Sequence, residues 1–335
     1  MRFPPAVLSL AHLGGGMAVG LGLAMALTLT GCRPDPAPAA ANPPLRVGID
    51  LWAGYYPLVL ASERGLLREE NVAVDVLVPG DTHRMIADFA ASQYDLIGVS
   101  LADVVLATRV NPDMRMILNS DESAGADLIL GPQPLLLPAQ LHGKRIGTTL
   151  GGFGELFVRH FLELQGIRPE EVLLVNTDAA NVPDLLKRGA IDVGHTWEPY
   201  AAQARSAGFQ VWFTSAETPG LIVDGLVARG TVIRERAPEL RGLVRAWFRA
   251  VAWWKAHPAE GNALIERRLR LPAGSVSWQG IRLLDQADNR RAFAQRPPGA
   301  LRQACASYVE FFIARGTLSE RLPPEALLDG SFVDE

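Results

Sequence analysis

Aromatic and acidic residues recur where short apolar stretches of the chain end. Aromatic rings can stack on a planar molecule or cover a cation, and carboxylates accept hydrogen bonds or pair with cations. Glycine-rich backbone before a helix can hold an anion or a carbonyl oxygen. These residue types indicate binding chemistry, and the candidate site residues are Trp52, Tyr55, Tyr56, Ser100, Asp103, Asp121, Asp127, Gly152, Phe153, Trp197, Glu198 and Asp224.

The aromatic residues Trp52, Tyr55 and Tyr56 follow the first predicted strand. Loops beyond strand ends commonly carry function, so we expect at least one of these rings to contact a ligand. The alternative is that they pack against the surface of their own lobe. Gly152 and Phe153 belong to a Gly-Gly-Phe-Gly segment before a helix, which lacks the lysine and the following serine or threonine of nucleotide-binding loops.

Two further groups of candidates have local alternatives. Ser100 and Asp103 lie near a predicted helix start, where capping explains either residue as well as ligand binding does. Asp121, Ser123 and Asp127 are expected in a loop after the fourth strand. Turn formation would account for one of them, whereas three polar groups in a short loop favour a polar ligand.

Trp197 and Glu198 follow another predicted strand and are the leading candidates for ligand contact. Glu198 could instead cap the next helix. Asp224 lies inside an apolar strand, where an unpaired carboxylate is unfavourable. We therefore expect a partner for Asp224, which is the ligand, a backbone amide of a hinge or an arginine.

The candidate site is acidic. The lysines of the chain are Lys144, Lys187 and Lys255, and none falls at the end of a predicted strand. Nitrate or a sulfonate would gain little from these side chains, although helix N-termini could still serve an anion. A cationic or hydrogen-bond-donating, partly aromatic nitrogen compound fits the set better.

Composition excludes several other functions. The chain has 335 residues, of which 48% are hydrophobic, and its net charge of −4 shows no basic excess for nucleic acid. The cysteines are Cys32 and Cys305, and the latter lies in an apolar-periodic stretch that indicates a core position. No disulfide framework, metal-ligand spacing, cofactor motif or catalytic serine elbow is present in the sequence.

The elements that must position the site alternate strands with amphipathic helices, which predicts an α/β fold in two series. Crossings between two lobes are expected near Asp127–Pro132 and Leu221–Leu226, so lobe 1 would comprise 44–129 plus 224–335, and lobe 2 would comprise 130–223. The predicted strands are Leu45–Ile49, Val72–Val78, Leu96–Val99, Met114–Leu118, Ala126–Leu130, Lys144–Thr148, Val172–Val175, Ile191–His195, Val211–Thr214 and Leu221–Val227.

The N-terminal segment resembles an export signal. Leu29-Thr30-Gly31-Cys32 ends an apolar run and is similar to the lipobox of bacterial lipoproteins. The resemblance implies a signal peptide over 1–31, lipid on Cys32 and a periplasmic protein anchored to a membrane. The alternative is an uncleaved anchor helix. Residues 32–44 are rich in proline and alanine, which predicts an extended tether.

Several motifs in order resemble one family. Trp52-Ala-Gly-Tyr-Tyr-Pro, Asp121-Glu-Ser-Ala-Gly-Ala-Asp127, Gly189-Ala-Ile-Asp-Val, Trp197-Glu-Pro and Pro219-Gly-Leu-Ile-Val-Asp224 are among the matches. They are similar to the nitrate/sulfonate/taurine-type substrate-binding proteins of ABC importers. That family also includes binders of pyrimidine precursors of thiamine.

The resemblance implies a type II periplasmic-binding-protein fold, with two α/β lobes, a hinge and a ligand cleft between the lobes. It implies a protein that captures a small solute and delivers it to an ABC permease and its ATPase, and we expect a monomer without a cofactor. The acidic candidate residues favour a small nitrogen-containing organic solute. The alternatives are a nitrate or sulfonate binder, a ligand-sensing partner of a signalling receptor, and an enzyme like the thiamine-pyrimidine synthases. The last branch carries a cysteine-rich loop that this chain lacks.

Overall fold

The structure is a computed structural model, which describes residues 42–79, 82–198 and 200–334. The predicted signal peptide over 1–31, the lipidation site at Cys32 and most of the predicted tether lie outside the described residues. None of the helices among the described residues has the length and hydropathy needed to cross a bilayer.

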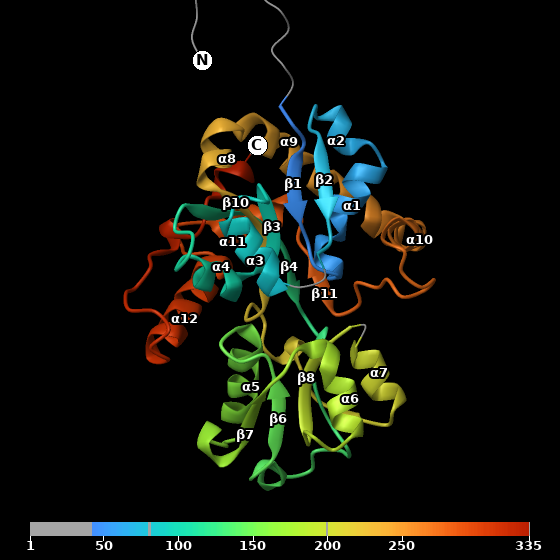
Figure 1. Ribbon diagram of the computed structural model, residues 1–335, viewed down its shortest axis with the longest axis vertical. Coiled ribbons are helices and arrows are strands. Elements are labelled where there is room, and N and C mark those ends of the chain that lie inside the picture. The colour runs from blue at the N-terminus through green and yellow to red at the C-terminus, as the bar shows by residue number, and fades with distance from the viewer. Residues whose placement is uncertain (1–41, 80–81, 199, 335) are drawn as a thin grey trace, which may run out of the picture. The chain divides into compact units, whose positions relative to one another are not determined.

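A six-stranded sheet, called the first sheet, has the strand order β11-β4-β10-β3-β1-β2 (Figure 1). β1, β2 and β3 are parallel, whereas β10 runs antiparallel to both of its neighbours, β3 and β4. Its central strands β3 and β10 are buried on both faces, as strands covered by helices on both sides are. The strands are β1 (Leu45–Gly48), β2 (Val74–Leu77), β3 (Leu96–Ser100), β4 (Met114–Ser123), β10 (Val223–Arg229) and β11 (Ile281–Leu283).

A five-stranded sheet, called the second sheet, has the order β7-β6-β8-β5-β9. β6 is parallel to β7 and β8, and β5 is antiparallel to β8 and β9. It has its own apolar core, built around Phe157, Phe161 and Phe213. The strands are β5 (Asp127–Gly131), β6 (Arg145–Thr148), β7 (Leu173–Asn176), β8 (Val193–Trp197) and β9 (Gln210–Thr214).

Helices cover the two sheets, and their apolar faces supply much of the core. Trp247, Val251 and Trp254 recur at helical spacing on α9, and all three are fully buried. The helices are α1 (Tyr56–Glu63), α2 (Leu66–Glu69), α3 (Thr82–Ala90), α4 (Leu101–Ala107), α5 (Phe153–Leu164), α6 (Val182–Lys187), α7 (Tyr200–Ser206), α8 (Gly230–Glu235), α9 (Ala237–Ala256), α10 (Pro258–Leu269), α11 (Gln286–Phe293) and α12 (Ala300–Ala314).

The predicted strands correspond to β1 to β10, with the main difference near the first crossing, whereas β11 was not predicted. β4 was expected to end at Leu118, but it continues through Asn119 to Ser123. Its polar end remains a strand because β10 and β11 lie on both sides of it and pair with its backbone. Asp121 and Ser123 therefore lie in a buried strand, and the prediction of a loop there is wrong.

Two short segments connect the sheets side by side. The first is Ala124–Ala126, since β5 already belongs to the second sheet, and the second runs from Ser215 to Ile222. The predicted boundary between 129 and 130 thus cuts through β5. The Ser215 hydroxyl lies 2.7 Å from the Ser123 hydroxyl and accepts a hydrogen bond from the Gly125 N–H at 2.8 Å.

Candidate functional site

Three predicted site residues lie in one row across neighbouring strands of the first sheet. In the register of β10, Asp224 pairs with Ser100 of β3 on one side and with Asp121 of β4 on the other. All three residues are buried. The antiparallel β10 therefore places its carboxylate between the other two positions.

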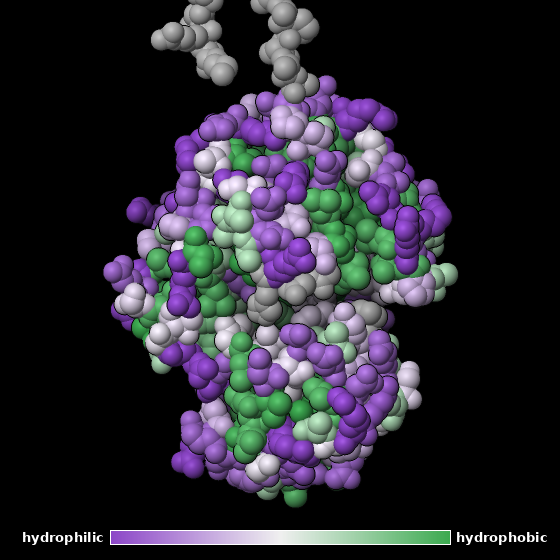
Figure 2. All heavy atoms as spheres, in the orientation of Figure 1, coloured by the Kyte–Doolittle hydropathy of each residue, from purple (hydrophilic) through white to green (hydrophobic). Residues whose placement is uncertain are grey.

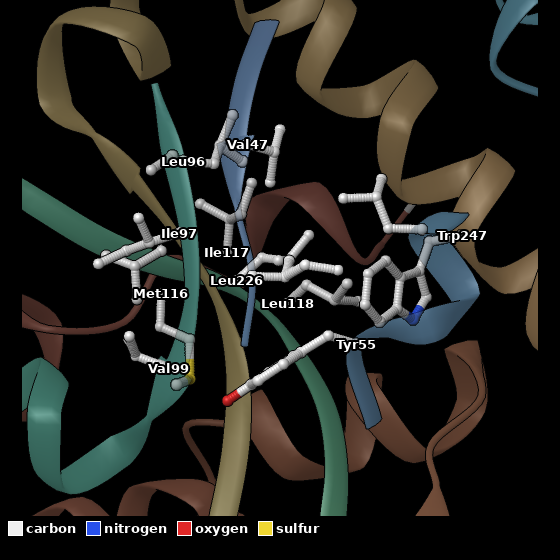
Figure 3. Close-up of a cluster of buried hydrophobic side chains, with 14 of the residues drawn as sticks. Val47, Tyr55, Leu96, Ile97, Val99, Met116, Ile117, Leu118, Leu226 and Trp247 are labelled. Carbon is white, nitrogen blue, oxygen red and sulfur yellow. The ribbon is translucent and has the colours of Figure 1, made fainter. Parts of the chain in front are cut away.

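Two of the predicted aromatic residues donate hydrogen bonds to this row. The Tyr55 hydroxyl donates to Asp224 Oδ1 at 2.6 Å, and Trp52 Nε1 donates to Asp121 Oδ1 at 3.0 Å. Figure 3 shows the Tyr55 ring among the apolar side chains of the first sheet. Gly54 permits the approach, because a Cβ there would lie 1.8 Å from Asp121 Oδ2. The partner of Asp224 is thus a tyrosine, which the sequence analysis did not include among its alternatives.

Burial raises the pKa of these groups. The pKa of Asp121 rises to about 7 because of burial, and the hydrogen bonds from Ser120 and Trp52 only partly oppose that rise. Burial, followed by the charge of Asp121, raises the pKa of Asp224 well above its ordinary value. In the described part of the chain, no lysine or arginine lies within ion-pair distance of Asp121 or Asp224.

The second sheet contributes Asp127, the first residue of β5. Asp127 Oδ1 lies 3.0 Å from Nε2 of His195 in β8. Its charge makes a smaller contribution to the raised pKa values of both Asp121 and Asp224, so the three carboxylates are close enough to interact electrostatically. We call Asp121, Asp127 and Asp224 the acidic centre.

Predicted aromatic residues also lie around His195. The rings of Phe153 and Trp197 have centroids 5.6 Å apart, and the Phe153 and His195 rings meet edge to face at 5.9 Å. Phe153 and Trp197 are half-buried. Together with the acidic centre, they could hold a cation that carries a flat apolar part.

Two predicted contacts have local explanations. Both carboxylate oxygens of Glu198 are engaged, one by Arg205 Nη2 at 2.5 Å and one by the Ala202 N–H at 3.1 Å. This is the capping alternative for Glu198. Ser100 caps α4 by accepting from the Asp103 N–H at 3.2 Å, and its hydroxyl donates to Asp103 Oδ2 at 2.7 Å.

The glycine-rich start of α5 already has a negative group. The buried Glu155 carboxylate accepts from the Gly151 N–H at 2.9 Å and pairs with Arg159 at 2.7 Å and Arg315 at 3.2 Å. An anion beside Gly152 would meet this charge, so the arrangement disfavours the anion-binding interpretation of the segment.

Tyr56 lies apart from the acidic centre. Burial raises its pKa well above the ordinary value, and the nearby Asp50 and Tyr200 add smaller contributions. Tyr200 is the first residue of α7, a helix that packs beside β8 of the second sheet. Tyr56 therefore lies near the lobe that contains the second sheet. Tyr56 is the first helical residue of α1 and is buried.

The sequence analysis missed His195 and Thr148. His195 was assigned only to a predicted strand, and Thr148 ended another strand. The alternation along β8 places Val193, His195 and Trp197 on one face, and the pairing of β8 with β5 sets Asp127 opposite Trp197. His195 could have been found from the sequence, because it is two residues before the proposed site residue Trp197 and so lies on the same face of the strand.

One cavity among the described residues lies away from the acidic centre. Its volume is about 320 Å³. An apolar area over β2 and α1 in Figure 2 marks the same part of the first sheet, and the lining residues are Leu51, Val59, Ser62, Val76, Val78, Arg268, Leu269 and Arg270. Within the described ranges, no group of three histidine, cysteine or acidic residues could hold a metal ion.

Comparisons with known proteins agree on family and fold. The family model described as NMT1/THI5 like matches residues 52–261. A protein of Brucella abortus (strain 2308), named only as a binding protein, is 21% identical over 297 residues, which are 85% of this chain and 90% of that protein.

Two solved structures share the fold over nearly the whole described chain. The alkanesulfonate-binding protein SsuA of Xanthomonas axonopodis pv. citri, bound to MOPS, is similar with a TM-score of 0.69 at 17% identity, over 86% of this chain and 99% of that one. A cysteine-to-serine variant of DszB in complex with biphenyl-2-sulfinic acid gives a TM-score of 0.65 at 17% identity, over 86% and 98%.

Proposed function

Because the chain belongs to the NMT1/THI5-like family, we propose that it is the solute-binding component of an ABC importer. It captures a small nitrogen-containing organic solute between its lobes and delivers it, unaltered, to the permease and its ATPase. The two-lobe fold shared with SsuA supports the general role. The acidic centre supports the choice of solute.

The observation that carries the proposal is the set of buried carboxylates with neutral donors. Asp121 and Asp224 receive hydrogen bonds from Trp52, Ser120 and Tyr55, and none of these donors brings a positive charge. A protonated nitrogen would supply the missing charge and would lower the raised pKa values of these acids. A sulfonate or nitrate would add a further negative charge to the same place.

The test is titration calorimetry with matched ligands that share one ring. Benzylammonium carries a positive charge, benzyl alcohol is neutral and benzenesulfonate is negative. We expect benzylammonium to bind most tightly and benzenesulfonate not to bind measurably. Taurine, nitrate and aminopyrimidines complete the panel. Tight binding only to sulfonates or nitrate would overturn the assignment of the solute class.

The alternative of an enzyme is suggested by the structural likeness to DszB. Cys305, the only cysteine among the residues that the structure describes, is fully buried on α12, and burial raises the pKa of its thiol to about 12. A thiol in that state is a poor nucleophile. Mass spectrometry of the bound solute before and after incubation separates the two functions, because turnover would favour the enzyme.

We further propose that the mature chain starts at Cys32, carries lipid on that thiol and works as a monomer in the periplasm. Arg236 Nη2 donates to the Pro43 carbonyl at 2.8 Å, which holds the chain where the proline-rich tether would end. Cys32→Ser should release the protein from the membrane fraction of its host. Retention in that fraction would contradict the lipid anchor.

A further inference from the structure

A buried hydrogen-bonded chain runs from Thr148 through His195 to Asp127. The Thr148 hydroxyl lies 3.1 Å from His195 Nδ1, and His195 Nε2 lies 3.0 Å from Asp127 Oδ1. Each of the three residues is at least 97% buried. They come from three strands of the second sheet, β6, β8 and β5.

The directions of these two hydrogen bonds depend on which groups carry protons. An ionised carboxylate only accepts hydrogen bonds, so with Asp127 ionised, Nε2 of His195 carries the hydrogen that Asp127 receives. In the neutral ring, Nδ1 is then an acceptor, and the Thr148 hydroxyl donates to it. Both ring nitrogens are occupied, and one oxygen of Asp127 is committed to His195.

The surroundings hold the ring in this orientation. The Phe157 ring lies 5.1 Å from the His195 ring between centroids, and the Trp197 ring lies at 5.8 Å. Gly154 of α5 completes the enclosure, because a Cβ there would lie 2.7 Å from Thr148 Oγ1 and 3.0 Å from His195 Nδ1. A larger residue would push the helix away from the chain.

Asp127 is fixed from its backbone as well. Its N–H lies 3.2 Å from the Ser123 hydroxyl oxygen and 3.3 Å from that of Ser215, beside the two connecting segments. The titratable groups that face its carboxylate from other elements are Asp121 of β4, Asp224 of β10 and Tyr308 of α12. Its side chain is thus held at the point where the two sheets meet.

We propose that His195 and Thr148 are positioning residues for the solute. They engage Asp127 Oδ1 and orient the carboxylate so that its second oxygen is available to the protonated nitrogen of the solute. The role rests on the proposed function, since it requires a cationic solute at the acidic centre. His195 and Thr148 would thus affect binding without contacting the solute themselves.

Variants of His195 test the role in binding, with benzylammonium as the probe. In His195→Phe the donor to Asp127 is lost, and we expect an affinity loss of about 30-fold, as for a charge-assisted hydrogen bond. His195→Gln keeps an N–H donor and should recover most of the affinity. His160→Phe, on the exposed side of α5, is the control and should bind as the unmodified protein does. Equal losses in the Phe and Gln variants would overturn the role.

Nitrogen NMR of histidine-labelled protein without solute reads the hydrogen positions directly. We expect a neutral His195 ring protonated at Nε2, a signature that Thr148→Val shifts and Thr148→Ser preserves. A ring protonated at Nδ1, or at both nitrogens, would overturn the inference and leave the proposed function intact. The expected signature without any benzylammonium binding would overturn the proposed solute class, and the binding role of His195 with it.

Discussion

Two buried carboxylates of this protein have opposite surroundings. Glu155, at the start of α5, is bound by two arginines and a backbone N–H. Asp121, in β4, is equally buried but receives hydrogen bonds only from the neutral Trp52 and Ser120. Buried charges are stable when paired and hydrogen-bonded, so Glu155 is complete within the protein.

Asp121 lacks a positive partner within the described residues, and burial raises its pKa to about 7. The comparison separates a structural carboxylate from one that is ready for a ligand. Glu155 joins α5 to Arg315, the residue after α12, and hence the two lobes, whereas Asp121 lies where a solute could supply the charge. Changes to the two residues should therefore affect different measured quantities.

The largest effect is expected from Asp121→Asn. The substitution keeps the shape but removes the charge, and we expect the affinity for benzylammonium to fall by about 100-fold. Because no charge is then buried, the solute-free variant should be more stable than the unmodified protein at about pH 8, by roughly 1 to 2 kcal/mol. Calorimetry and urea unfolding measure the two effects. The exposed Asp113→Asn, which disturbs only the pair with Arg234, is the control.

A second effect is the pH dependence of stability without solute. The folded-state pKa of Asp121, about 7, lies above the ordinary value of 3.8, so between these values the folded protein binds more protons than the unfolded chain. Its contribution to stability is complete below about pH 4 and is lost as the pH rises to about 7, by up to about 1.4 kcal/mol per unit. The slope should be smaller in Asp121→Asn, and equal slopes in both proteins would contradict the raised pKa.

Glu155→Gln should lower the free energy of unfolding by about 2 kcal/mol, because Arg159 and Arg315 lose their partner while remaining partly hydrated. Its effect on affinity should be small, since the residue lies outside the acidic centre. Urea unfolding and calorimetry on the same variant check both parts. A large loss of affinity with unchanged stability would reverse the assignment of roles.

The smallest effect is expected from Glu198→Gln. Both oxygens of this carboxylate are engaged at the start of α7, and exposed ion pairs with arginine contribute little, about 0.5 kcal/mol. The affinity should change less than about twofold in calorimetry, within the scatter of such contacts. A loss comparable to that of Asp121→Asn would restore Glu198 as a ligand contact.

The alternation of strands and helices, and most of their bounds, follow from the sequence because apolar periodicity is local. The arrangement of the candidate site was harder to predict from the sequence. Asp121 lies in a strand rather than a loop, since long-range pairing with β10 and β11 satisfies the backbone of a polar segment. Local sequence patterns do not reveal which distant strands will pair with a segment.

The row formed by Ser100, Asp121 and Asp224 illustrates the same limit. Each residue was selected for its type and its place near a strand end, yet only the antiparallel register of β10 brings them together. Tyr55 as the partner of Asp224 depends on a contact between residues 169 positions apart. The glycine-rich segment before α5 suggested a site for an anion or a carbonyl oxygen, but Glu155 of the same helix already accepts a hydrogen bond from the Gly151 N–H.

The Ser123 and Ser215 hydroxyls have a mechanical consequence. They fasten the two connecting segments to each other at one level, with the Gly125 N–H as a further attachment. Sliding one segment along the other would break these bonds, whereas bending both together would preserve them. These bonds therefore favour bending of the two segments together over sliding of one along the other.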